Sequence, residues 1–449
     1  MLKDKMLAVM ADVCAQAAER DELVEAIAIA LLTRKNLFIL GDTGQAKSFV
    51  VNEFRRRITG AKQFERLMSK QADEEQLFGR IDLSSLIPGN ADRELLDGDP
   101  QYQACLKELA AYAESGAEPG VIEGLLQKLD ALKRAAYAIH GNRPKLVTAG
   151  KIPDSHIVFL DEIFKANDGI LNSLLTALNE RRFTNEGDSI DIPAISFFAA
   201  SNEIPNFANA EEKILKALYD RLELKLVTDY VQDRDARLAV LRNKQTGLSG
   251  GIRHTISLDE LYAMQAEASA VAIPDSVNEL MDALLCELRE KGVHVSDRKY
   301  FGYYPLAQAA AWLKGRAAAE PADLLILRHY LWTSPDERAA IRQTLERRCA
   351  NPLKDALDDI YRMAVESFDD FEDAAAGADT AKRIGKLRNE YISLYETIAA
   401  MLSKTNDDSE KAQINEALAL VEDYSRKAHA AVSYTFAPLS ELYELRKTA

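Results

Sequence analysis

The feature that most constrains the fold is a glycine-containing loop between a predicted strand and a predicted helix. Residues 36–40 form a short apolar run, which predicts a buried strand, and are followed at once by Gly41, Asp42, Thr43, Gly44, Gln45, Ala46, Lys47 and Ser48. A phosphate-binding loop needs backbone N–H groups around an anion, a helix N-terminus aimed at it, a lysine for the phosphates and a hydroxyl for Mg²⁺. The loop therefore predicts nucleotide binding by an α/β domain.

One position departs from the usual G-x-x-x-x-G-K-[ST] pattern of such loops. Ala46 stands where the last glycine is expected, which weakens the motif when it is taken alone. The strand before the loop and the apolar-periodic helix after it favour a phosphate loop over a plain turn. We therefore expect Lys47 to meet the β- and γ-phosphates and Ser48 to hold the metal ion.

Two adjacent carboxylates follow a second apolar run. Residues 157–160 predict a buried strand, and Asp161 and Glu162 come directly after it. A buried strand that ends in two acids loses stability unless the carboxylates meet a cation or water. Downstream of a phosphate loop, the pair predicts Mg²⁺ binding by Asp161 and activation of the attacking water by Glu162. Two solvated acids at a strand end are the alternative.

Three further polar residues have functional and ordinary readings. Asn202 ends the apolar run at 195–200 and would orient water, or be a turn residue. Arg221 follows a helix and precedes a strand-like run, where it would act as an arginine finger on a neighbouring subunit's nucleotide or form a surface ion pair. Arg298 begins a helix, from which it would reach the phosphates, or it lies in an ordinary capped helix start.

The order of the segments predicts three regions. Apolar runs alternate with helical segments over residues 1–230, which predicts an α/β core with a mostly parallel sheet. Residues 88–141 interrupt this rhythm with an alanine-, leucine- and glutamate-rich helical insert. Residues 231–345 read as short helices punctuated by prolines. Residues 346–449 predict a separate helical bundle, because apolar residues recur at spacings of three and four from Ile384 to Met401.

Composition bounds the classes of function. Lysine and arginine number 56 and aspartate and glutamate 71, which gives a net charge of −15 and disfavours a role that depends on coating nucleic acid. No apolar run approaches the roughly 20 residues of a membrane span, and residues 1–5 lack a signal-peptide pattern. The four cysteines are widely spaced without Cys-x-x-Cys, which is typical of free thiols. We expect a cytoplasmic protein.

The full set of motifs resembles the MoxR branch of the AAA+ ATPases and is most similar to its RavA-type members. The resemblance spans roughly residues 15–335, and the alanine before the lysine is usual in that branch. Beyond the loop it is carried by the stretches at 67–70, 77–79, 146–150, 157–166, 170–181, 199–205, 217–221 and 295–298.

The resemblance implies an ATP-binding core with a helical lid, Mg²⁺ as cofactor, and a homo-oligomeric ring that is commonly a hexamer. The motif positions correspond to the Walker A residues Lys47 and Ser48, the Walker B pair Asp161 and Glu162, the first sensor Asn202, the arginine finger Arg221 and the second sensor Arg298. Arg20 and Asp21 lie where the family's helix passes the adenine. Residues 181–193 would form a hairpin that points towards the ring pore.

The family's usual partners are proteins with von Willebrand factor A domains, and its usual role is chaperone-like remodelling or maturation of other proteins. Asp42 and Thr43 replace the Pro-Pro usual after the first glycine, and the segment at 84–146 is longer than in RavA-like chains. No β-rich domain is evident in the C-terminal region. A nucleic-acid motor, an ATP-gated scaffold and a metabolic kinase remain alternatives, of which the acidic charge disfavours the first.

Overall fold

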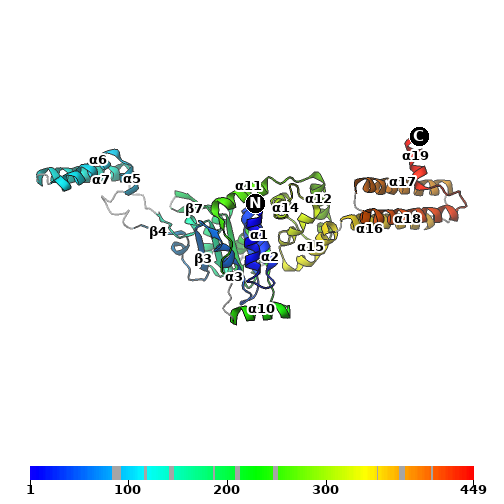
Figure 1. The fold of residues 1–449 in the computed structure, drawn as a ribbon, viewed down its shortest axis with the longest axis horizontal. Coiled ribbons are helices and arrows are strands. Elements are labelled where there is room, and N and C mark those ends of the chain that lie inside the picture. The colour runs from blue at the N-terminus through cyan, green and yellow to red at the C-terminus, as the bar shows by residue number, and fades with distance from the viewer. Residues whose placement is uncertain are drawn as a thin grey trace. The chain divides into compact units, whose positions relative to one another are not determined.

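The computed structural model describes residues 1–82, 93–115, 119–140, 146–185, 188–207, 213–245, 251–350, 352–373, 380–405 and 408–448. The chain divides into two compact units, and Figure 1 labels the helices and strands along the chain. The first unit comprises Met1–Val271 and Gln308–Ala317, and the second comprises Ala272–Ala307 and Ala318–Ala449.

A five-stranded parallel sheet forms the centre of the first unit. Its strand order is β10-β1-β9-β6-β3, with bounds β1 Leu37–Leu40, β3 Gln63–Leu67, β6 Ile157–Asp161, β9 Ser196–Ser201 and β10 Leu224–Val227. Each apolar run predicted as a strand is therefore a strand. Parallel pairing requires crossover segments, and helices supply them. The predicted α/β fold class is confirmed.

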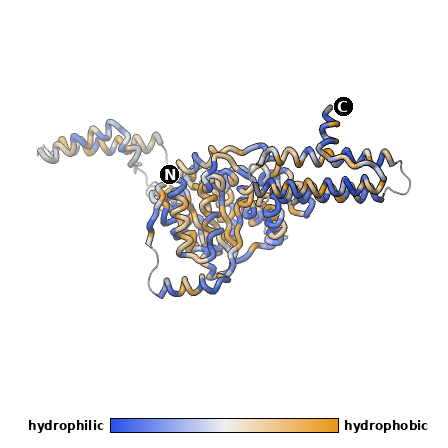
Figure 2. Tube along the Cα trace, turned by 45° about the vertical axis from the view of Figure 1, so that its right-hand side comes forward, coloured by the Kyte–Doolittle hydropathy of each residue, from blue (hydrophilic) through white to orange (hydrophobic). Residues whose placement is uncertain are grey.

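Helices pack against the sheet through its alternating apolar side chains. These helices are α2 Asp21–Thr33, α3 Lys47–Arg55, α8 Asp168–Glu180 and α9 Lys213–Arg221, and α1 Leu2–Cys14 packs on α2 and α3. Phe38 joins a buried cluster with Leu174 of α8 and Tyr219 of α9, and Figure 2 shows the apolar residues concentrated in this core. Burial of such side chains contributes about 1.5–3 kcal/mol each. The strand ends that carry polar motifs are thus held on a packed scaffold.

Smaller elements complete the first unit. Two short strands, β2 Ile58–Thr59 and β11 Ile256–Ser257, pair in parallel. The predicted hairpin contains the antiparallel strands β7 Arg182–Asn185 and β8 Asp188–Asp191, while residues 186–187 lie outside the described residues. The remaining helices are α4 Glu74–Phe78, α10 Arg234–Gln245 and α11 Leu258–Ser269, and the 3₁₀ turns are η2 Ile152–Asp154 and η3 Ile163–Lys165.

The insert has its own small core. Antiparallel strands β4 Arg80–Ile81 and β5 Leu146–Val147 lie at its two ends, and between them run α5 Arg93–Gly98, α6 Pro100–Ser115 and α7 Pro119–His140. Leu96, Tyr102, Cys105 and Leu129 are buried together. Parts of the predicted 88–141 segment, namely residues 88–92, 116–118 and 141, lie outside the described residues.

The second unit begins with short helices and ends with long ones. The first part contains α12 Asp275–Glu290, α13 Asp297–Phe301, η5 Pro321–His329, η6 Pro335–Glu337, α15 Arg338–Leu345 and the π-helical turn η7 Glu346–Ala350; α14 Tyr304–Leu313 runs across the boundary between the units. The second part contains α16 Pro352–Asp373, α17 Thr380–Lys404, α18 Asp408–Ala431 and α19 Leu439–Thr448.

The long helices form a bundle, as the apolar spacing predicts. Ile384, Leu387, Tyr391, Leu394 and Ile398 are buried in a common core with residues of α16 and α18. The Tyr391 hydroxyl donates a 2.9 Å hydrogen bond to the Ala364 carbonyl, so the one polar atom of that side chain is satisfied inside the core.

Among the described residues, no helix is long and apolar enough to cross a bilayer.

We expect a buried histidine, His329, to make the second unit sensitive to acid. Burial lowers the pKa of His329 to about 3, and the neighbouring Arg328 acts in the same direction. Between pH 6.5 and 3 the unfolded chain therefore binds a proton that the folded chain does not. The free energy of unfolding consequently decreases as the pH is lowered through this range. We expect His329→Gln to lessen this loss by up to about 1.4 kcal/mol per pH unit.

Denaturant unfolding of the second unit between pH 6.5 and 4.5 measures the effect. His294→Gln, at an exposed histidine of the same unit, is the matched control and should leave the slope unchanged. Parallel pH dependences for wild type and His329→Gln would contradict the assignment of a neutral buried imidazole.

Candidate nucleotide site

The predicted phosphate loop joins β1 to α3. The Gly41 amide donates to the Ser201 carbonyl at 3.1 Å, and Gln45 Oε1 accepts a 2.8 Å hydrogen bond from the Thr228 hydroxyl. Gly44 has φ 89° and Ala46 has φ 61°. Positive φ values at these positions are typical of an anion-binding nest, in which successive backbone N–H groups face a common concavity.

Ala46 adopts the left-handed conformation in which glycine is usual. At φ 61° and ψ 21° it immediately precedes Lys47, the first residue of α3. A non-glycine residue in this region costs on the order of 1–3 kcal/mol and persists where the surroundings enforce it. The alanine therefore keeps the backbone of the loop that the usual glycine would give.

Gly41 leaves no room for a side chain. A Cβ added there would lie 2.1 Å from Thr228 Oγ1 and 2.2 Å from Gln45 Oε1. We expect Gly41→Ala to break the Gln45–Thr228 hydrogen bond, to destabilise the first unit by about 1–3 kcal/mol, and to weaken nucleotide binding at least tenfold. Thermal unfolding and titration with a fluorescent nucleotide measure both effects.

Gly124→Ala is the matched control for that substitution. Gly124 lies inside α7, where an added Cβ meets nothing within 4 Å, so alanine should stabilise the helix by about 1 kcal/mol. Unchanged stability and nucleotide affinity in Gly41→Ala would contradict the packing described for the loop.

Lys47 folds back onto its own loop. Its Nζ donates to the Gly41 carbonyl and at 3.0 Å to the Asp42 carbonyl, and the residue is 7% exposed. Burial lowers the pKa of Lys47, while the carboxylates of Asp161 and Glu162 act in the opposite direction. The Lys47 ammonium group thus lies against the loop in which a phosphate would bind.

Ser48 and Asp161 meet across the sheet edge. The Ser48 hydroxyl donates to Asp161 Oδ2 at 2.7 Å, although the two residues are 113 positions apart in the chain. A hydroxyl and a carboxylate are hard oxygen ligands, and Mg²⁺ typically takes one or two such protein groups with phosphate and water oxygens. This pair fits the predicted metal site.

Glu162 is held in an uncommon conformation. Its φ of 53° and ψ of 45° are left-handed, and its amide donates to Asp161 Oδ1 at 3.0 Å. Its Oε2 lies 3.3 Å from Lys165 Nζ, and the side chain is 15% exposed. Backbone strain of this kind is concentrated at functional sites. Glu162 thus follows Asp161, the carboxylate bonded to Ser48, in a strained turn.

Asn202 is placed by the strand order. β9 lies between β1 and β6, with Ser201 opposite Leu40 of β1. Asn202 follows Ser201 and is exposed at the edge where the phosphate loop and Asp161 emerge. The structure thus brings it to the predicted edge, between the lysine and the acidic pair.

Arg221 lies at the N-terminal end of strand β1, whereas the phosphate loop follows the C-terminal end of that strand. Arg221 ends α9, and its carbonyl accepts a 3.0 Å hydrogen bond from Asn36, the residue that precedes β1. The loop follows β1, whose four residues separate the two ends by roughly 13 Å at about 3.3 Å per residue. Arg221 is therefore not brought to the phosphate loop of its own chain.

Arg20 borders a cavity of about 250 Å³ beside the loop. Its Nε donates to the Gln45 carbonyl at 3.2 Å, and its NH2 group donates to the Asp229 carbonyl at 2.7 Å. Burial lowers the pKa of Arg20. The cavity is lined by Glu19, Arg20, Glu22, Leu23, Leu226, Val227, Thr228, Asp229, Tyr230 and Gln232.

The two residues predicted near the adenine have different roles in the fold. Burial, together with a hydrogen bond to Asp21, raises the pKa of the Cys14 thiol to about 12, so Asp21 faces that thiol and is not among the residues that line the cavity. The sequence alone did not identify Thr228 and Tyr230 as cavity residues. The available signal was their position shortly after the strand-like run that follows Arg221, at the same side of the sheet as the phosphate loop.

Arg298 belongs to the second unit. It lies in α13, whose start is capped by the Ser296 hydroxyl accepting from the Lys299 amide, and it is exposed. Its approach to the phosphates stays a prediction.

Comparison with known proteins identifies the family of the chain. The model for the MoxR domain of MoxR-vWA-beta-propeller ternary systems matches residues 4–98 and 139–265, and an AAA lid domain model matches residues 273–345. The chain belongs to the MoxR family of AAA+ ATPases. Between its two segments the MoxR model passes over residues 99–138, which contain α6 and most of α7.

Relatives and a solved structure extend the similarity. An uncharacterized protein of Methanocaldococcus jannaschii is 30% identical over 71% of this MoxR-family chain and 69% of its own length. A second uncharacterized protein of that organism is 27% identical over 85% of this chain and 83% of its own. A crystal structure from Cytophaga hutchinsonii, at 14% identity, covers 77% of this chain and 93% of its own with a TM-score of 0.52, and so shares the fold.

Proposed function

We propose that this MoxR-family protein is a Mg²⁺-dependent ATPase that cleaves ATP at the interfaces of a homo-oligomeric ring. The observation that carries the proposal is the separation of Arg221 from the phosphate loop by the length of β1. An arginine finger stabilises the charge of phosphoryl transfer and is often supplied in trans. A second copy of the chain supplies Arg221 where the first copy holds the phosphates.

The residues that follow the C-terminal ends of the strands have separate roles in the proposed hydrolysis. The cavity beside Arg20 takes the base, and the backbone N–H groups of residues 42–48 take the phosphates. Lys47 exchanges the carbonyls of Gly41 and Asp42 for phosphate oxygens. Ser48 and Asp161 would hold Mg²⁺, which would neutralise phosphate charge. Glu162 accepts a proton from the attacking water, which Asn202 orients.

The family supports a proposal for the biological role. Its description as part of MoxR-vWA-beta-propeller systems supports a von Willebrand factor A-domain protein as partner and chaperone-like remodelling or maturation of a protein substrate as the role. The narrower resemblance to RavA-type proteins, a hexameric ring and a cytoplasmic location stay predictions. The net charge of −15 favours a protein substrate over a nucleic acid.

ATP turnover per subunit, measured against protein concentration with molar mass determined by light scattering, tests the proposal. The rate per subunit should rise as the oligomer forms and should vanish when Mg²⁺ is chelated. A rate independent of concentration, carried by monomers, would overturn the shared site. Absence of turnover in the assembled protein would overturn the ATPase assignment itself.

A further inference from the structure

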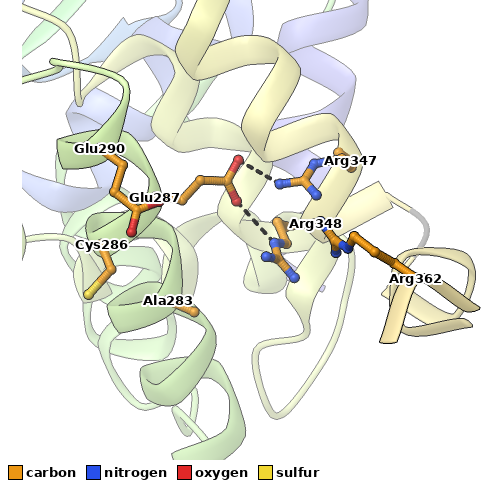
Figure 3. Close-up of a pocket in the computed structure, with 7 residues that line it drawn as sticks. All are labelled: Ala283, Cys286, Glu287, Glu290, Arg347, Arg348 and Arg362. Carbon is orange, nitrogen blue, oxygen red and sulfur yellow. Dashed lines mark hydrogen bonds and ion pairs between the residues drawn. The ribbon is translucent and has the colours of Figure 1, made fainter. Parts of the chain in front are cut away.

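A groove marks the place where the short helices of the second unit meet its long bundle. It has a volume of about 430 Å³ and is lined by Ala283, Cys286, Glu287, Glu290, Arg347, Arg348 and Arg362. These residues come from α12, η7 and α16, and Figure 3 shows the Glu287 carboxylate pointing at two guanidinium groups across the groove. The groove thus combines charged groups of the lid with charged groups of the bundle.

Three cationic side chains form ion pairs with Glu287. Its Oε1 lies 2.7 Å from Lys291 Nζ and 2.5 Å from Arg347, and its Oε2 lies 3.1 Å from Arg348 Nε. The carboxylate is 13% exposed. Burial opposes its ionisation, but the hydrogen bonds from Lys291, Arg348 and Arg347 outweigh burial and lower the pKa of Glu287 to about 2. Breaking the ion pairs of a largely buried carboxylate costs far more free energy than breaking a surface ion pair.

Arg348 continues the contact into the bundle. While its Nε meets Glu287, its NH1 group lies 3.3 Å from Asp359 of α16, and Asp359 also pairs with Arg362 one turn further along that helix. A planar guanidinium with donors on several edges is suited to bridge two carboxylates. One side chain therefore connects a lid helix to the first helix of the bundle.

The backbone between these elements is short and unusual. α15 passes into the π-helical turn at 346–350, which supplies Arg347 and Arg348 and buries Cys349. α16 begins at residue 352. π-Helical turns are rare and frequent at functional positions. Here the widened turn presents two consecutive arginines to the same carboxylate.

We propose that the bridge Glu287–Arg348–Asp359 makes the lid and the C-terminal bundle one rigid lever. A rotation of the lid is then carried to the far end of the bundle. α17 has 25 residues, which span about 37 Å, so a rotation of about 10° would displace its far end by roughly 6 Å. The bundle becomes the element that reports lid movement to a protein partner. The rigidity does not depend on the proposed ATP hydrolysis.

Distance distributions between two spin labels test the lever in the full chain. Glu279→Cys in α12 and Glu416→Cys in α18 are exposed labelling positions, in a background with Cys14 and Cys286 replaced by serine. Labelled protein is diluted with unlabelled protein, so that only distances within one chain are read. The variants are Glu287→Gln at the lid end, Asp359→Asn at the bundle end, and Glu290→Gln as the matched control on the same helix and groove.

We expect a single narrow distribution in the background protein and in Glu290→Gln, and a width at least twofold larger in both Glu287→Gln and Asp359→Asn. Asp359 is 30% exposed, so its variant keeps the test available if Glu287→Gln does not fold. The bridge is overturned if either bridge variant that folds keeps the narrow distribution, or if Glu290→Gln broadens it equally.

Discussion

Replacing Glu162 by glutamine is expected to slow ATP turnover by about 10²–10⁴-fold while nucleotide affinity is retained. Glutamine keeps the size of the side chain but cannot accept a proton from water, and a positioned general base contributes about this much. Lys47, Ser48 and Asp161, which hold the phosphates and metal in our proposal, are unchanged. Turnover under saturating ATP and equilibrium binding of a fluorescent ATP analogue separate the two properties.

Glu180→Gln is the control for the loss of one negative charge. Glu180 ends α8 and is exposed, so this variant should hydrolyse ATP at the wild-type rate. Normal turnover by Glu162→Gln would sink the assignment of Glu162. A parallel loss of nucleotide binding would show that the glutamate holds the loop together and does not act on water.

Arg221→Ala is expected to lower turnover by about 10³–10⁵-fold, the range measured for arginine fingers. Because Arg221 lies at the opposite end of β1 from its own phosphate loop, nucleotide binding by the isolated subunit should be unchanged. The loss should therefore appear in the assembled protein as a fall in kcat. Turnover and molar mass are measured together, so that loss of assembly is distinguished from loss of chemistry.

Mixing two inactive variants separates a shared site from a self-sufficient one. In a ring of Arg221→Ala and Glu162→Gln subunits, an interface between Glu162 of the first and Arg221 of the second is complete. Random 1:1 mixing restores about a quarter of the interfaces of a cyclic ring. No recovery after confirmed mixing would contradict the contribution of Arg221 across an interface.

Much of the fold was predictable from local patterns. The strands predicted at residues 36–40, 157–160 and 195–200 begin within one residue of the observed β1, β6 and β9, because short apolar runs bounded by polar residues leave a buried parallel strand little freedom. The C-terminal helices were predictable from the spacing of Ile384, Leu387 and Tyr391, all of which are buried. The lid is shown by the AAA lid domain match at residues 273–345.

The candidate site was predictable where its parts are neighbours in sequence. Lys47 and Ser48 begin the helix that directly follows the loop. Asp161 ends a strand, and Glu162 comes directly after it. The cavity beside Arg20 was not predictable in the same way. Thr228 and Tyr230 carry no motif, and only the pairing of β10 with β1 brings Thr228 beside Gln45.

The phosphate loop, the acidic pair and the type of each main element are predictable from residue order, because they depend on covalent neighbours and on periodicity. The contacts between distant segments arise only when the chain folds. Folding places Ser48 against Asp161, puts Arg221 at the end of β1 away from the phosphate loop, and joins Glu287 to Asp359 through Arg348. Such contacts arise from strand order and helix packing, which residue spacing along the chain does not specify.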